Sequence, residues 1–145
     1  MQVRHILRDK GPEVIAILST ASLAEAAGLL SARKIGALTV KSTSEALCGI
    51  ISERDLVRAI AAHGATALAD RVENHMTRGP VTCPQSDSVE MVMETMTRGR
   101  FRHVPVLDED HRVCGMISIG DVVKTRIAET VNEAAALRDY ISATA

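Results

Sequence analysis

The sequence repeats itself after 66 residues, and this duplication limits the folds open to the chain more than any other feature. The stretch GIISERDLV, residues 49–57, returns as GMISIGDVV, residues 115–123. The same shift places Ser22 on Ser88, needs no gap, and keeps most apolar residues aligned with apolar residues. Self-similarity at a fixed period indicates repeated structural units. Two copies are too few for a solenoid, so the pattern predicts two similar halves that pack face to face.

The composition narrows the class of protein. Of the 145 residues 46% are hydrophobic, but there is one Phe, one Tyr and no Trp, so the core must be largely aliphatic. A formal net charge of −1 argues against nucleic-acid binding, which is typical of strongly basic chains. No apolar run approaches the roughly 20 residues of a membrane span, and the N-terminus does not resemble a signal peptide. We expect a cytoplasmic protein without a membrane segment.

Each half shows the same order of expected elements. A short, β-branched stretch at residues 14–17, or at 81–83, predicts a strand. In the first half Ser22 and Glu25 form a capping box, which predicts the start of a helix that continues to about Arg33. Further strands are expected at residues 37–40, 47–52, 103–106 and 113–118, and further helices at 53–63, 89–96 and 119–127. Each half is therefore predicted to be a β-α-β-β-α unit.

These elements divide the chain into four parts. Residues 1–63 are expected to form the first repeat, 64–74 a linker, 75–127 the second repeat, and 128–145 a C-terminal extension. The extension keeps a weak apolar stripe, so we expect it to be helical.

Four segments together resemble the CBS-domain pair, or Bateman module: the two nine-residue stretches, the strand RHVPVLD, and the connection VENHMTRGPVTCPQSDSV. The likeness covers about residues 3–126. It implies an α+β fold in which two β-α-β-β-α repeats pack through their sheets with pseudo-twofold symmetry, followed here by a C-terminal helix. It also implies a homodimer, and clefts that bind adenosine-containing ligands such as AMP, ADP, ATP, NAD(H) or S-adenosylmethionine. Modules of this kind are regulatory and seldom catalytic.

The repeated Ser-x-x-Asp pattern has two interpretations. Ser52 with Asp55, and Ser118 with Asp121, are spaced as helix-capping pairs, and this role alone would explain both copies. A helix N-terminus also presents free N–H groups to a phosphate, and a carboxylate one turn in can accept hydrogen bonds from ribose hydroxyls. The resemblance implies this second role in addition, with the Asp residues at the ribose and the Ser residues in polar contact with the ligand.

The two copies differ where related modules often place a phosphate-binding cation. The second repeat has Arg102 and His103 where the first has glycine and alanine. We therefore expect the better phosphate site around Arg102, His103 and Asp121. Arg54, which aligns with Gly120, is a candidate for the missing cation of the first repeat, and both residues are candidate ligand contacts.

Three other features have plainer alternatives. The resemblance places adenine rings against the segment before the first strand, so Val81 and Ile15 are candidate base contacts or simply strand residues. The basic run 98–103 could face a phosphate or form a solvated turn, whereas a nucleic-acid patch would need more stacking aromatics. Lys10 could reach a phosphate, but we expect it to be solvated.

No motif predicts catalysis or metal binding. The GxSxG, HExxH and Walker patterns are missing, and neither the histidines nor the three cysteines have ligand spacing. We expect a non-enzymatic regulatory module without a catalytic cofactor or metal. It would bind an adenine nucleotide of the AMP or NAD type and signal to an unidentified protein partner. The alternative is a ligand-free, dimerising scaffold in which the Ser and Asp residues only cap helices.

Overall fold

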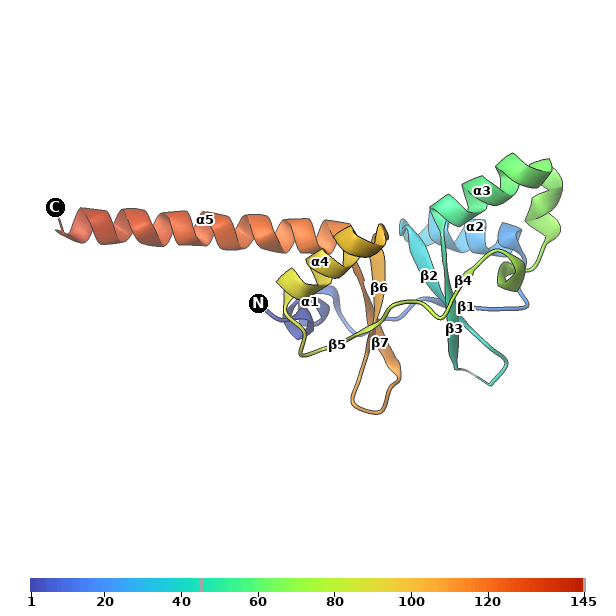
Figure 1. Ribbon diagram of the computed structural model, residues 1–145, viewed down its shortest axis with the longest axis horizontal. Helices are drawn as coiled ribbons and strands as arrows, with labels where there is room; N and C mark the ends of the chain where they lie inside the picture. Colours follow the sequence, from blue (N-terminus) through green and yellow to red (C-terminus); the bar gives the residue numbers. More distant parts are fainter. Residues whose placement is uncertain (45, 145) are drawn as a thin grey trace.

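The computed structural model describes residues 1–44 and 46–144, and within them the chain forms two β-sheets flanked by helices (Figure 1). The first sheet, in the order β1-β2-β3-β4, contains β1 Ala16–Leu18, β2 Ala37–Lys41, β3 Leu47–Ser52 and β4 Thr77–Arg78. The second, in the order β5-β6-β7, contains β5 Cys83–Pro84, β6 His103–Leu107 and β7 Val113–Ser118. The helices are α1 Val3–Lys10, α2 Leu23–Arg33, α3 Glu53–His63, α4 Val89–Gly99 and α5 Ile119–Thr144, with 3₁₀ helices η1 Gly64–Ala69 and η2 Val72–Asn74.

The strands pair at equivalent residues in the two sheets, which confirms the predicted pair of β-α-β-β-α units. In each sheet the first strand pairs in parallel with the second, and the second pairs antiparallel with the third. Ala37 lies opposite Ser52 in the first sheet, and His103 lies opposite Ser118 in the second. The register also shifts at corresponding positions, near the ends of β2 and β6.

The first strand of each unit begins two residues later than the pattern predicts. β1 starts at Ala16 instead of residue 14, and β5 starts at Cys83 instead of residue 81. The residues before each strand leave the sheet and line a cleft, which is described below. Their β-branched character therefore belongs to a cleft wall rather than to a strand.

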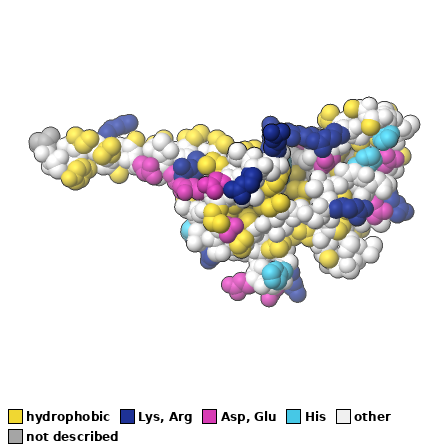
Figure 2. All heavy atoms as spheres, in the orientation of Figure 1, with side chains coloured by type: hydrophobic (Ala, Val, Ile, Leu, Met, Phe, Trp, Pro, Cys, Tyr) yellow, Lys and Arg dark blue, Asp and Glu magenta, His cyan; other side chains and the backbone are white. Residues whose placement is uncertain are grey.

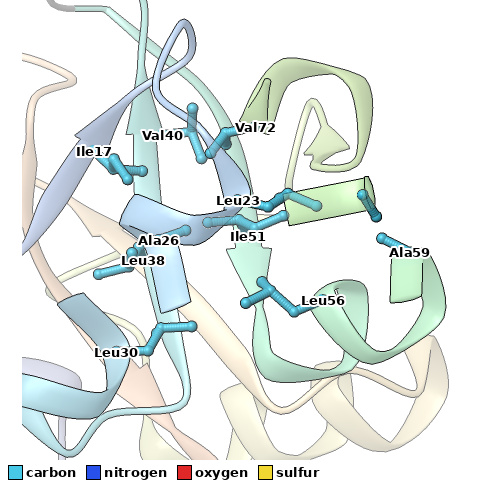
Figure 3. Packing of buried hydrophobic residues seen from close by; sticks show 11 residues of the cluster. Ile17, Leu23, Ala26, Leu30, Leu38, Val40, Ile51, Leu56, Ala59 and Val72 are labelled. Carbon is cyan, nitrogen blue, oxygen red and sulfur yellow. The ribbon is translucent and has the colours of Figure 1, made fainter. Parts of the chain in front are cut away.

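Each unit buries its own aliphatic cluster between its sheet and its helices. In the first unit Leu23 of α2, Leu38 of β2 and Ile51 of β3 are all 0% exposed (Figure 3). In the second unit Ile117 of β7 takes the place of Ile51 and is equally buried. The core is aliphatic, as the composition predicts.

The segments that precede the two units are exchanged between them. Val3 and Ile6 of α1 are buried in the cluster of the second unit, and the Val3 amide donates to the Asp87 carbonyl at 2.9 Å. Conversely, Ala67 of η1 and Val72 of η2 are buried in the cluster of the first unit. The expected linker thus contributes to a core, and α1 packs on the repeat that follows it by some 80 residues in the chain.

The last helix is continuous. α5 runs from Ile119 to Thr144, so the expected helix of the second unit and the C-terminal extension form one element. Its beginning packs on α4 and β7, and the rest leaves the body of the molecule as a single helix (Figure 1). Along α5 the side chains of Ile127, Val131 and Ile141 are exposed.

We predict that Ile51→Ala lowers the free energy of unfolding by about 2–5 kcal/mol, because it removes buried methyl groups and leaves a cavity. Val131→Ala truncates an exposed aliphatic side chain on the projecting part of α5 and should change this free energy by no more than about 0.5 kcal/mol. Urea unfolding followed by circular dichroism measures both. Equal losses in the two variants would contradict the position of the core.

Candidate functional site

Two clefts lie where the units meet, and the 66-residue shift relates them. The Ser118 cleft, about 510 Å³, takes the start of α5 from the second unit, and residues 11–15 and 34–37 from the first. The Ser52 cleft, about 670 Å³, takes the start of α3 from the first unit, and residues 79–81 and 99–103 from the second. Both volumes lie in the range of small-molecule sites. Since each cleft uses both units, neither unit forms one alone.

In the Ser52 cleft the predicted capping pair is present at the start of α3. The Asp55 amide donates to Ser52 Oγ at 3.4 Å, and Asp55 Oδ2 accepts from the Ser52 amide at 2.8 Å and from Ser52 Oγ at 3.0 Å. The other oxygen, Asp55 Oδ1, lies 3.8 Å from the Arg58 guanidinium. The cap holds the carboxylate at the helix N-terminus, so the structural role of this pair is established.

The Ser118 cleft repeats this cap and adds a cation. Asp121 Oδ2 accepts from the Ser118 amide at 2.9 Å and from Lys10 Nζ at 2.8 Å, and Lys10 Nζ also donates to the Met116 carbonyl at 2.9 Å. Burial raises the pKa of Asp121, but the hydrogen bonds from Lys10 and Ser118 and the Lys10 charge outweigh it and hold the pKa below its ordinary value. Lys10, expected to be solvated, is therefore an ion-pair partner of the cleft carboxylate.

Three residues line both clefts: Gly36, Arg102 and His103. They mark the midline between the units. A Cβ at Gly36 would stand 3.2 Å from the His103 ring, so the glycine leaves room for the imidazole. Burial lowers the pKa of His103; Lys10 and Arg102 act in the same direction, while Glu53 and Asp121 oppose it. The imidazole is therefore neutral at neutral pH.

The two clefts differ in their charged side chains. The Ser52 cleft is lined by two acidic residues and by four arginines, namely Arg54, Arg58, Arg100 and Arg102. The Ser118 cleft is lined by Glu13 and by Lys10, Lys34 and Arg102. Lys and Arg side chains gather on the upper edge where the units meet (Figure 2). The Ser52 cleft thus has the larger number of cationic side chains.

The candidate residues from the sequence divide between the clefts. Ser52, Arg54, Asp55 and Val81 belong to the Ser52 cleft, Ser118 and Gly120 to the Ser118 cleft, and Arg102 and His103 to both, with Asp121 joined to the Ser118 cleft through Lys10. Ile15 lines the Ser118 cleft, at the position equivalent to Val81. Sequence reasoning missed Lys34 and named Arg100 only as part of the basic run 98–103. The repeat held the signal, because the 66-residue shift aligns these two basic residues.

The sequence matches the family described as CBS domain twice, over residues 3–62 and 71–128. The chain therefore belongs to the CBS-domain family and carries two CBS domains. A CBS-domain containing protein from Agrobacterium tumefaciens has the same fold, with a TM-score of 0.82 and 46% sequence identity over 86% of this chain and 92% of that one.

Two further solved structures contain ligands. A CBS domain pair in complex with 5′-methylthioadenosine and S-adenosyl-L-methionine has a TM-score of 0.79 and 27% identity, covering 89% of this chain and 98% of that one. A CBS domain protein from Pyrobaculum aerophilum, complexed with AMP, has a TM-score of 0.75 and 26% identity, covering 83% and 89%.

A curated relative is longer than this chain. A mitochondrial CBS domain-containing protein of Arabidopsis thaliana is 37% identical over 116 residues, which are 77% of this chain and 56% of that protein. Among residues 1–44 and 46–144 no helix is long and apolar enough to cross a membrane. In the same residues no group of three or more His, Cys, Asp or Glu is placed to hold a metal ion.

We predict that His103 makes the protein less stable below pH 6.5. The lowered pKa means that the unfolded chain binds a proton more readily than the folded one, so the free energy of unfolding falls as the pH falls through this range. One group contributes a slope of at most about 1.4 kcal/mol per pH unit, and nothing well above its unfolded pKa. Urea unfolding at several pH values between 5 and 8 measures this. The free energy of unfolding should fall less steeply with falling pH in His103→Asn than in the wild type. Identical slopes would contradict the assignment.

Proposed function

We propose that this chain is a regulatory module that binds an adenosine-containing nucleotide in the Ser52 and Ser118 clefts and passes their occupancy to a protein partner. One observation carries the proposal. Each cleft has an Asp carboxylate at the N-terminus of its helix, held by its own cap and, for Asp121, joined to the cleft through Lys10, and several basic side chains line each cleft.

These groups suit the ribose and the phosphate of a nucleotide. A carboxylate accepts about four hydrogen bonds, so Asp55 and Asp121 can cap a helix and still accept from ribose hydroxyls. The free N–H groups and positive dipole end of a helix favour a phosphate, and arginine binds one bidentately. Val81 and Ile15 provide an apolar wall for the base in their respective clefts. Capping and ligand binding are therefore compatible roles for the same Ser-x-x-Asp motif.

The ligand class follows from what the bound compounds share. AMP, 5′-methylthioadenosine and S-adenosyl-L-methionine, found with two CBS-domain neighbours, all contain adenosine. AMP, ADP, ATP and NAD(H) are the candidates for this chain. The four arginines of the Ser52 cleft favour a ligand that carries phosphate.

A ligand alters the partner only if it binds two arrangements of the protein with different affinities. α5 begins in the Ser118 cleft and ends far outside the body of the molecule, so a displacement of its first turn is carried along one continuous helix. The exposed apolar residues of its projecting part offer a partner a contact surface. This route connects the cleft to the outside without catalysis, and we propose no enzymatic activity.

We further propose a homodimer. Val57 of α3 and Val123 of α5 are equivalent under the 66-residue shift, and they are 65% and 48% exposed. Two equivalent apolar positions on a pseudo-symmetric molecule suit an isologous contact between two copies. A cytoplasmic location stays a prediction, because one curated relative is described as mitochondrial.

The first test is calorimetric titration of the purified chain with AMP, ADP, ATP and NAD. We expect binding, and we expect Asp121→Asn and Asp55→Asn each to weaken it about 10-fold or more at its own cleft, because a hydrogen bond to a charged acceptor is lost. Asp139→Asn, on the projecting part of α5, is the matched control and should bind as the wild type does. If nucleotide-free protein bound none of these ligands, the scaffold alternative would replace the sensor.

The dimer is tested by sedimentation. We expect the wild type to sediment with the mass of two chains, and the double variant Val57→Glu, Val123→Glu with the mass of one, because a buried unpaired charge is costly. Leu18→Glu introduces the same charge at an exposed position of β1 and should remain a dimer. A monomeric wild type would rule out this assembly.

A further inference from the structure

We propose that Arg102 is a phosphate-binding cation common to the two clefts, and that phosphorylated ligands therefore bind to them anticooperatively. This inference rests on the proposed nucleotide binding and adds a rule of regulation to it. Arg102 lines both the Ser52 cleft and the Ser118 cleft, whereas the other basic residues each line one of them.

The backbone of Arg102 is fixed while its side chain is available. The Ile119 amide, at the start of α5, donates to the Arg102 carbonyl at 2.8 Å. Within the described residues, no hydrogen bond or ion pair holds the guanidinium, which lies on an exposed residue. The anchor places the side chain at the midline, and the free guanidinium can turn to either cleft.

The midline has room for only one such cation. Gly36 is the equivalent of Arg102 in the first unit, and its carbonyl accepts from the Glu53 amide at 3.0 Å in the equivalent way. A Cβ there would already stand 3.2 Å from the His103 ring, so a longer side chain at position 36 would displace the imidazole. The neutral His103 does not replace the missing positive charge.

Two phosphates therefore meet one guanidinium. Arginine offers a rigid fork of donors that engages one phosphate bidentately. A second phosphate finds the fork occupied and adds a like charge across the midline. Couplings between sites are typically five- to 150-fold in affinity. An adenosine ligand without phosphate does not need the guanidinium, so its binding in one cleft should leave the other unaffected.

The test compares one-cleft and two-cleft binding of AMP by calorimetry. Asp121→Asn weakens the Ser118 cleft and Asp55→Asn weakens the Ser52 cleft, so the first, tighter binding step of each variant gives the association constant of the unaltered cleft. For independent clefts the product of these constants equals the overall two-site constant of the wild type. We expect the wild-type value to be at least fivefold smaller with AMP, and equal to the product with 5′-methylthioadenosine.

Variants of the basic residues identify the cation. In an Arg102→Gln background the product and the overall constant should agree for AMP. Lys34→Ala removes a basic side chain of the Ser118 cleft, and Arg100→Ala removes the equivalent one of the Ser52 cleft. Each variant should weaken AMP binding in its own cleft, and the overall constant should still be smaller than the product. One AMP per wild-type chain, with one AMP also bound by each Asp variant, would be the extreme form of the expected result.

The outcomes that overturn the inference differ from those that overturn the proposed function. If AMP fills both clefts with an overall constant equal to the product, nucleotide binding stands and the shared cation is wrong. The shared cation is also wrong if the overall constant stays smaller than the product in the Arg102→Gln background. It is likewise wrong if one Asp variant binds no AMP while the wild type binds one. Absence of AMP binding to every protein removes both proposals.

Discussion

The site depends on where the antiparallel hairpin of each unit ends. Ser52 is both the last residue of β3 and the cap of α3, so the strand turns directly into the helix. The first amide of the helix, at Glu53, then donates to the carbonyl of Gly36, the residue before β2, and Ile119 donates to Arg102, the residue before β6, in the same way. This contact ties the midline residue to the helix N-terminus. A shift in strand register would separate them and would also turn side chains to the other face.

The duplication makes sites only because the halves are complementary. Each unit supplies a helix N-terminus to one cleft. To the other cleft it supplies the residues that precede its first two strands. The helix α1 precedes the first unit but packs in the core of the second, and η1 and η2 precede the second unit but pack in the core of the first. Separating the units would therefore expose apolar residues of both cores, and this cost favours the arrangement that keeps the clefts assembled.

The local elements and the caps could be predicted because they depend on residues close in the chain. The capping boxes at Ser22 and Ser52 and the ends of β3 and β7 follow from such patterns. The position of α1 could not be predicted, since eight residues with two buried side chains give too short a periodicity and their partners lie far along the chain. For the same reason Lys10 was interpreted as solvated, although it contacts Asp121.

The difference between the two clefts follows from the symmetry itself. Away from a pseudo-twofold axis, a duplicated chain can keep the same residue in both copies, as Ser52 and Ser118 show. Near the axis the two equivalent side chains approach each other, and two large ones cannot fill the same space. Gly36 is the small equivalent of the large Arg102, and the space over the glycine holds the ring of His103. Divergence at the axis therefore gives two clefts with different charged side chains that border the same residues. In this arrangement the occupancy of one cleft can alter the other.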